Sequence, residues 1–174
     1  MFRKLIIFFI LPFLYFTPSI SNDLKIAYVD MSRILNESSA GKNLTEQIKS
    51  LNTSNVNKYK KKEKELIIME KDLLKKKNIL SKEDFEAKVI ALQTTIKKFK
   101  NDINVSRKDV ESKRNKGTAK LFEFLNSILT DYSSKNSITL VLQKKNILIA
   151  KSELDITSQI LELLNKKVKT IKLK

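Results

Sequence analysis

Residues 85–103 read FEAKVIALQTTIKKFKNDI, and this stretch has the clearest periodicity in the chain. Its apolar residues recur at alternating steps of four and three: Phe85, Val89, Leu92, Ile96, Phe99 and Ile103. A 3.5-residue repeat is typical of a coiled-coil seam, in which one narrow stripe of a helix packs against a partner helix. Val110 follows Ile103 by one heptad. The stretch therefore predicts a long helix that pairs with another.

The partner helix is predicted upstream. A looser rhythm of the same period runs through Tyr59, Leu66, Met69, Leu73 and Leu80, and Leu44, Ile48 and Leu51 continue it in a shifted phase. Between the two patterns, Asn78 can end one helix, and Ser81 with Asp84 forms a capping-box-like start for the next. We therefore predict an antiparallel helical hairpin, or arm, over residues 44–117 with its tip near 78–82. The alternative is a compact bundle, but one narrow stripe and a high charge density argue against it.

The two ends of the chain predict a small β-containing body, residues 22–43 and 118–174. Three β-prone runs, 25–30, 138–142 and 147–150, are expected to form short strands, the last two joined by a hairpin-like connection. Ser152 to Asp155 can start a final helix. Three short strands leave open edges and too little core, so we expect the body to associate between subunits. The expected body contacts are Ile26, Tyr28, Val29, Leu140, Leu142, Ile147 and Ile149. The predicted fold class is mainly α, with a long arm projecting from this body.

The first 21 residues predict a secretory signal peptide. Arg3 and Lys4 precede an apolar run over residues 5–16, followed by Pro18 and small residues, which predicts cleavage between Ser21 and Asn22. A retained membrane anchor is the alternative. Twelve apolar residues span only about 18 Å of helix, short of a bilayer core of roughly 30 Å.

Positive charge is concentrated on the predicted arm. Residues 58–120 carry 20 basic and 10 acidic side chains, within a chain of net charge +16. A coding bias toward Lys could raise the total, but it does not explain why the two ends are nearly balanced. We expect a functional basic surface and assign no separate role to any one of its residues. The candidates are Lys60, Lys61, Lys62, Lys75, Lys76, Lys77, Lys97, Lys98, Lys100, Arg107, Lys108, Lys113, Arg114 and Lys116.

The composition excludes several classes of chemistry. The chain has no Cys and no His, which excludes thiolate and imidazole catalysis and zinc-ribbon sites. Only Gly41 and Gly117 are available, so no glycine-rich phosphate loop is expected. Acidic residues such as Glu83 and Asp84 lie at a predicted helix start, where capping explains them. We therefore predict a protein that is not an enzyme and has no cofactor and no bound metal.

The chain resembles the Skp/OmpH-like periplasmic chaperones. The resemblance is carried by residues 25–30, 39–42, 138–142, 147–150, 154–157 and 160–165, and Gln143 departs from it where an Asp often follows the valine-leucine run. It implies a periplasmic homotrimer whose three arms enclose unfolded outer-membrane proteins in transit, without ATP. It also implies transient contact with an anionic membrane surface or lipopolysaccharide, which we assign to no residue.

Two other functions compete with this one. An exported coiled-coil spacer would share the arm but would have no affinity for an unfolded client. A basic nucleic-acid-binding protein would use the same charge, but Arg is scarce and no aromatic residues interleave the basic region, so no nucleic-acid partner is expected.

Overall fold

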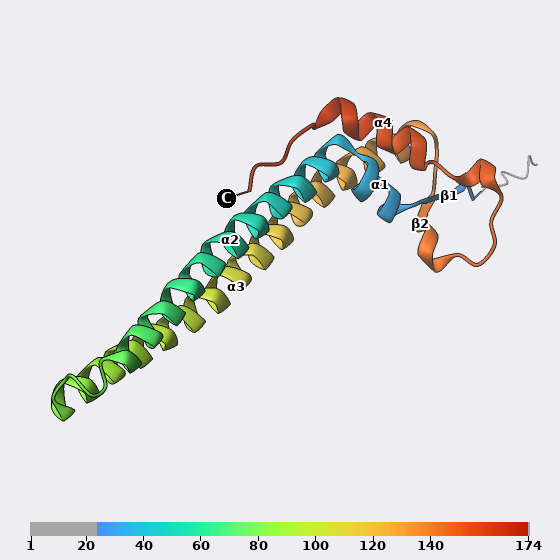
Figure 1. The fold of residues 1–174 in the computed structure, drawn as a ribbon. Helices are drawn as coiled ribbons and strands as arrows, with labels where there is room; N and C mark the ends of the chain where they lie inside the picture. Colours follow the sequence, from blue (N-terminus) through green and yellow to red (C-terminus); the bar gives the residue numbers. More distant parts are fainter. Residues whose placement is uncertain (1–23, 174) are drawn as a thin grey trace, which may run out of the picture.

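The structure is a computed structural model that describes residues 24–173. A long two-helix arm projects from a small body (Figure 1). The body contains both the first and the last secondary-structure elements of the described chain. The elements in chain order are β1 (Ile26–Val29), α1 (Met31–Glu37), α2 (Ser39–Lys75), α3 (Lys82–Lys135), β2 (Leu140–Gln143), η1 (Lys144–Asn146), η2 (Ser152–Leu154) and α4 (Thr157–Lys167). The predicted fold class, mainly helical with a long hairpin and a small sheet, is confirmed.

The arm is the antiparallel pair α2 and α3. The 37 residues of α2 give it a length of about 55 Å at 1.5 Å per residue. The 54 residues of α3 continue past the root of the arm into the body, and the helix runs through Gly117 without a break. The same helix is therefore half of the arm and a main element of the body.

The turn at the tip differs in detail from the prediction. Helix α2 ends at Lys75 rather than at Asn78, because the amides of Ile79 and Leu80 both donate to the carbonyl of Lys76 and close the turn early. The predicted cap of α3 is confirmed: the Ser81 hydroxyl accepts from the amide of Asp84 at 3.1 Å. The predicted pair of Ser81 and Asp84 thus marks the start of α3.

Few side chains are buried between the two helices of the arm. Leu44, Ile48, Leu66 and Val110 are buried, whereas the six seam residues of 85–103 are only half-buried. Tyr59 reinforces the middle of the seam, because its ring lies 6.1 Å from that of Phe99 and its hydroxyl donates to the backbone carbonyl of Asp102 at 3.0 Å. Most arm side chains beside the seam remain in solvent, as a two-helix coiled coil requires.

The body is built around a parallel pair of strands. Ile26 pairs with Leu140 and Val29 with Gln143, so the first and last thirds of the chain lie side by side. One cluster of buried residues from β1, α1, α3 and α4, including Ile34, Leu121, Leu125, Ile160 and Leu164, forms the core. All five side chains are fully shielded from solvent, and burial of their apolar surface stabilises the body.

Gly41 allows α1 and α2 to pack closely. A Cβ atom at this position would lie 1.8 Å from the carbonyl oxygen of Leu35, which is backbone and cannot move aside locally. Ser38 caps α2 by accepting from the amide of Gly41 at 3.0 Å, and it is itself fully buried. This glycine therefore serves helix packing rather than a phosphate loop.

Three details predicted for the body are wrong. Residues 147–150 form no strand, because η1 turns the chain away from β2 and leaves Leu148 and Ile149 almost fully exposed. The connection over 143–146 is accordingly a 3-10 turn rather than a hairpin. The last helix starts at Thr157 instead of 152–155, because Asp155 stays extended in a bridge with Tyr28.

The predicted signal peptide and its cleavage site at Ser21 and Asn22 lie outside the described residues. Within residues 24–173, no helix combines the length and the hydropathy that a membrane span requires.

Candidate functional surface

The predicted basic residues lie along the whole arm and are well exposed. Five of the fourteen lie on α2 or at its C-cap, Lys77 lies in the turn and the other eight follow along α3. Only Lys113 is half-buried. The structure therefore spreads these cations over a surface and gathers them into no single site.

Few of these cations are neutralised locally. Lys62 pairs with Glu65 at 3.1 Å, Lys75 with Asp72 at 3.3 Å and Lys113 with Asp109 at 2.9 Å. The other candidates form no ion pair within the described part of the chain. Their charges are screened by solvent but remain available to an outside partner.

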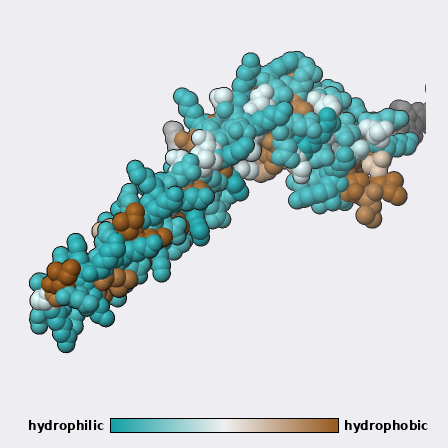
Figure 2. Space-filling view, in the orientation of Figure 1, coloured by the Kyte–Doolittle hydropathy of each residue, from teal (hydrophilic) through white to brown (hydrophobic). Residues whose placement is uncertain are grey.

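The arm also exposes apolar side chains that are not part of its seam. Val56, Ile67 and Leu74 are 50%, 45% and 60% exposed and follow one another at steps of 11 and 7 residues. These steps are close to whole turns of 3.6 residues, so the three side chains form one stripe along a side of α2. We call these three residues the arm stripe. Figure 2 shows hydrophobic patches along the arm among hydrophilic surface.

Grooves follow both sides of the seam. One, of about 830 Å³, is lined by Lys58, Lys61, Lys62 and Lys98 around Tyr59. The other, of about 300 Å³, is lined by Val56 with Phe99, Ile103 and Arg107. The arm therefore offers shallow surfaces that combine apolar floors with basic rims.

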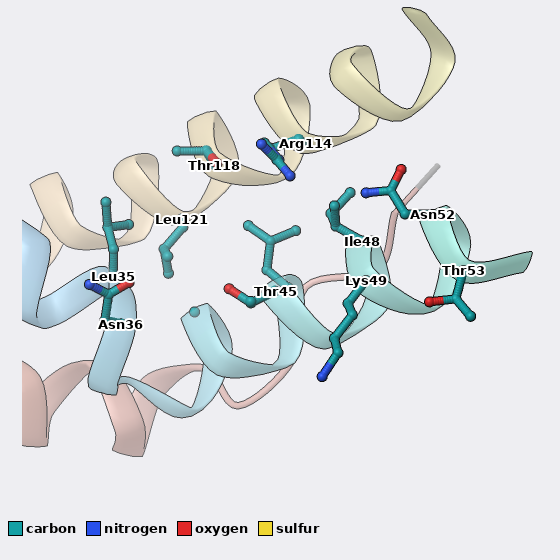
Figure 3. A pocket seen from close by; sticks show the side chains of 12 residues that line it. Leu35, Asn36, Thr45, Ile48, Lys49, Asn52, Thr53, Arg114, Thr118 and Leu121 are labelled. Atoms are coloured by element: carbon teal, nitrogen blue, oxygen red, sulfur yellow. The ribbon is translucent and has the colours of Figure 1, made fainter. Parts of the chain in front are cut away.

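A further groove of about 510 Å³ lies at the root of the arm (Figure 3). Side chains from three helices surround it, with Leu35 from α1, Ile48 from α2 and Leu121 from α3. Lys49 and Arg114 add positive charge to its rim. The pattern of the arm, apolar below and basic at the edge, thus continues to the body.

The predicted body contacts divide into two groups. Tyr28 and Val29 are buried, while Ile26 and Ile147 are half-buried. Leu140 and Leu142 are 44% and 38% exposed, because in β2 it is Val141 that packs on the core and its neighbours face outward. Ile149, in the loop after η1, is 94% exposed. Figure 2 shows a hydrophobic patch over the loop that follows β2. Leu140, Leu142 and Ile149 therefore form an exposed apolar surface on the body.

A polar cluster connects the end of β1 to the start of α4. The fully buried Thr157 hydroxyl accepts from the amide of Asp30 at 2.8 Å and donates to the carboxylate of Asp155. The Asp30 carboxylate accepts from the amide of Arg33 at 2.9 Å and lies 3.6 Å from Lys144 Nζ. The Arg33 amide, and to a lesser extent Lys144, hold the pKa of Asp30 below its ordinary value, although burial opposes them.

Neither this cluster nor any other group among the described residues has the composition of a metal site, that is, three or more His, Cys, Asp or Glu side chains. Sequence reasoning missed the polar cluster and the arm stripe. The stripe could have been found from its 11 and 7 spacing, whereas no local pattern connects Thr157 with Asp30, because the two residues are 127 positions apart.

Comparison with known proteins gives two matches. Residues 25–164 match the family model described as outer membrane protein (OmpH-like). The fold is similar to the crystal structure of a candidate outer membrane chaperone (OmpH-like) from Caulobacter crescentus CB15, with a TM-score of 0.81 and 19% sequence identity. That match covers 91% of this chain and 95% of the other. No curated protein matches the chain significantly.

Proposed function

Because the chain belongs to the OmpH-like outer membrane protein family, we propose that it is an ATP-independent holdase chaperone of the periplasm. Its arms surround unfolded outer-membrane proteins and prevent their aggregation during transit. The observation that carries this proposal is the arm surface, where unpaired cations surround exposed apolar side chains along two thin helices.

The chemistry of that surface suits an unfolded, acidic client. Each Lys contributes a weak, screened attraction, and many such contacts along one chain add up to avidity without a tight pocket. The arm stripe adds apolar contact at about one site every two to three turns of α2, which suits the scattered apolar side chains of an unfolded β-barrel protein. Such contacts exchange quickly and leave the client unfolded.

We propose that three copies assemble through the body. Leu140 and Leu142 face outward from β2, and the β-prone run 147–150 has no strand partner within the described chain. A neighbouring copy would cover both the apolar surface and the free backbone groups of this edge. Three arms that project from one body would then enclose a cavity. The proposed export through residues 1–21 places this assembly in the periplasm, near anionic lipid or lipopolysaccharide.

The test uses residues 22–174 and an unfolded β-barrel membrane protein. Light scattering is expected to give three subunits, and a near-stoichiometric amount of the assembly is expected to keep the diluted client soluble. Replacing Lys60, Lys61 and Lys62 by Gln is expected to weaken client binding and leave the assembly intact, because these residues lie far from the body. The matched control replaces the exposed body residues Lys135, Lys145 and Lys151 by Gln.

Equal loss of binding in both triple variants would indicate a general charge effect and contradict an arm-specific site. A wild-type assembly with no effect on client aggregation would favour the structural spacer instead. Tight binding of duplex DNA by the arm, without binding of the client, would favour the nucleic-acid reading.

A further inference from the structure

The last described residues, 168–173, form a tail that returns from α4 toward the arm (Figure 1). Helix α4 ends at Lys167, and Val168 is extended, with φ −146° and ψ 126°. Helix α4 itself belongs to the body, since Ile160 and Leu164 are fully buried in its core. The tail therefore connects a body helix to another part of the molecule.

The tail packs on the root of the arm. Ile171 is only 2% exposed and lies in the body core cluster, whereas Leu173 packs with Leu44, Ile48 and Val110, the buried residues between α2 and α3. Gly117 makes room for this contact, because a Cβ atom there would lie 3.2 Å from Leu173 and 2.5 Å from Leu44. The two tail side chains thus join the body core to the arm seam.

Gln47 of α2 fixes the backbone of the tail. Its side-chain amide donates to the carbonyl oxygen of Ile171 at 2.7 Å, and its side-chain oxygen accepts from the amide of Leu173 at 3.5 Å. Asn43, one turn earlier, accepts a second bond from the same amide group at 2.6 Å and orients it. The Gln47 side chain thus binds one acceptor and one donor of the tail backbone.

The tail covers only one side of the helix pair. Gln47 and Leu51 lie beside it, while Thr45 and Lys49, about half a turn away on α2, line the open groove of Figure 3. The family match ends at residue 164, so the tail lies beyond the matched residues. The tail therefore covers one side of the arm root, and the groove leaves the other side open.

We infer that residues 168–173 are a tether that limits the bending of the arm against the body. The arm has few buried contacts of its own, so its angle depends on what holds residues 44–51 and the facing part of α3. The tether supplies this restraint through Ile171, Leu173 and Gln47. The inference does not depend on the proposed function, and its test needs no client.

The experiment measures the distance between the arm tip and the body in the complete protein. The chain has no native Cys, so spin labels can be placed at Asn78→Cys in the tip and Glu153→Cys in η2, both exposed. Labelled chains are diluted with unlabelled protein so that only distances within one chain are read. Deleting residues 168–174 is expected to broaden the distance distribution. Amide exchange over residues 44–51 is expected to become roughly tenfold faster as local opening increases.

Two substitutions separate a tether from a general contribution to stability. Gln47→Ala leaves every tail residue in place but removes both bonds to its backbone, and it is expected to broaden the distribution to a smaller extent. It carries the test alone if the deletion prevents folding. Lys172→Ser, at an exposed tail position, is the matched control and is expected to change neither quantity. A folded Gln47→Ala variant with the wild-type distance distribution and exchange rates would overturn the inference.

Discussion

Asp30 has two separate roles at the junction of β1 and α1. Its carboxylate caps α1 through the amide of Arg33 and pairs with Lys144, while its backbone amide donates to the buried hydroxyl of Thr157. The cap could be predicted from the sequence, since an Asp precedes the helix. The partners Lys144 and Thr157 could not, because parallel pairing of β1 with β2 brings them together only in the folded body.

The lowered pKa of Asp30 predicts a pH dependence of stability. A carboxyl whose folded pKa lies below its unfolded pKa stabilises the fold fully above the unfolded value, near 3.9, and loses this contribution as the pH falls through the folded value. Asp30→Ala is expected to lower the free energy of unfolding by about 1 kcal/mol at neutral pH, through loss of the cap. Denaturant unfolding at pH 7 and below pH 4 measures the effect.

Asn at position 30 is the matched control for this experiment. Its side-chain oxygen can still accept from the amide of Arg33, but it carries no charge. Asp30→Asn is therefore expected to keep most of the stability at pH 7 and to flatten the dependence on pH between 5 and 3. An unchanged pH profile in both variants would show that other carboxyls account for the acid sensitivity.

At the scale of elements, the arm was the part most open to prediction. Its 3.5-residue pattern is local, and each seam residue from Phe85 to Ile103 needs only one neighbouring helix. The run 147–150 has an equally clear β propensity, yet it forms no strand here because a strand needs an edge to pair with. Local sequence patterns thus predicted the arm correctly, because its two helices follow each other in the chain. The β propensity of 147–150 was misleading, because a strand there would need a partner from another segment.

The thin seam predicts that the arm can lose stability without affecting the body. Leu66 is the most buried residue of the outer arm, at 5% exposure, so Leu66→Ala is expected to cost roughly 2 kcal/mol locally. Amide exchange in the neighbouring turns of α2 and α3 should then become about 30-fold faster, whereas exchange in the body should remain at the wild-type rate. Hydrogen exchange with mass spectrometry measures both regions in one experiment.

Leu74→Ala is the control for this substitution, because Leu74 is 60% exposed and contributes little to the seam. It is expected to leave exchange unchanged throughout. Faster exchange in the body of the Leu66→Ala variant would mean that arm and body unfold as one cooperative unit, contrary to the thin packing described above.

At the scale of the whole molecule, the body of the single chain exposes an apolar surface. Its body has a fully buried core but presents Leu140, Leu142, Leu148 and Ile149 to solvent, beside a two-stranded sheet. The three β-prone runs of the sequence indicated a small body with open strand edges. It could not indicate the parallel pairing of β1 and β2, because that arrangement depends on α2 and α3 returning the chain to the same place.

We expect the double substitution Leu140→Asp and Leu142→Asp to dissociate the assembly into single subunits. Both side chains face outward from β2, so two buried carboxylates would be unpaired at the proposed interface, while the core contact of Val141 is retained. Light scattering should give the mass of one subunit, and circular dichroism should still show a helical chain. Ile68→Asp, on an exposed arm position, is the control and should assemble normally. An intact assembly in the double variant would place the interface elsewhere on the body, and would leave the exposed pair Leu148 and Ile149 as the surface to test next.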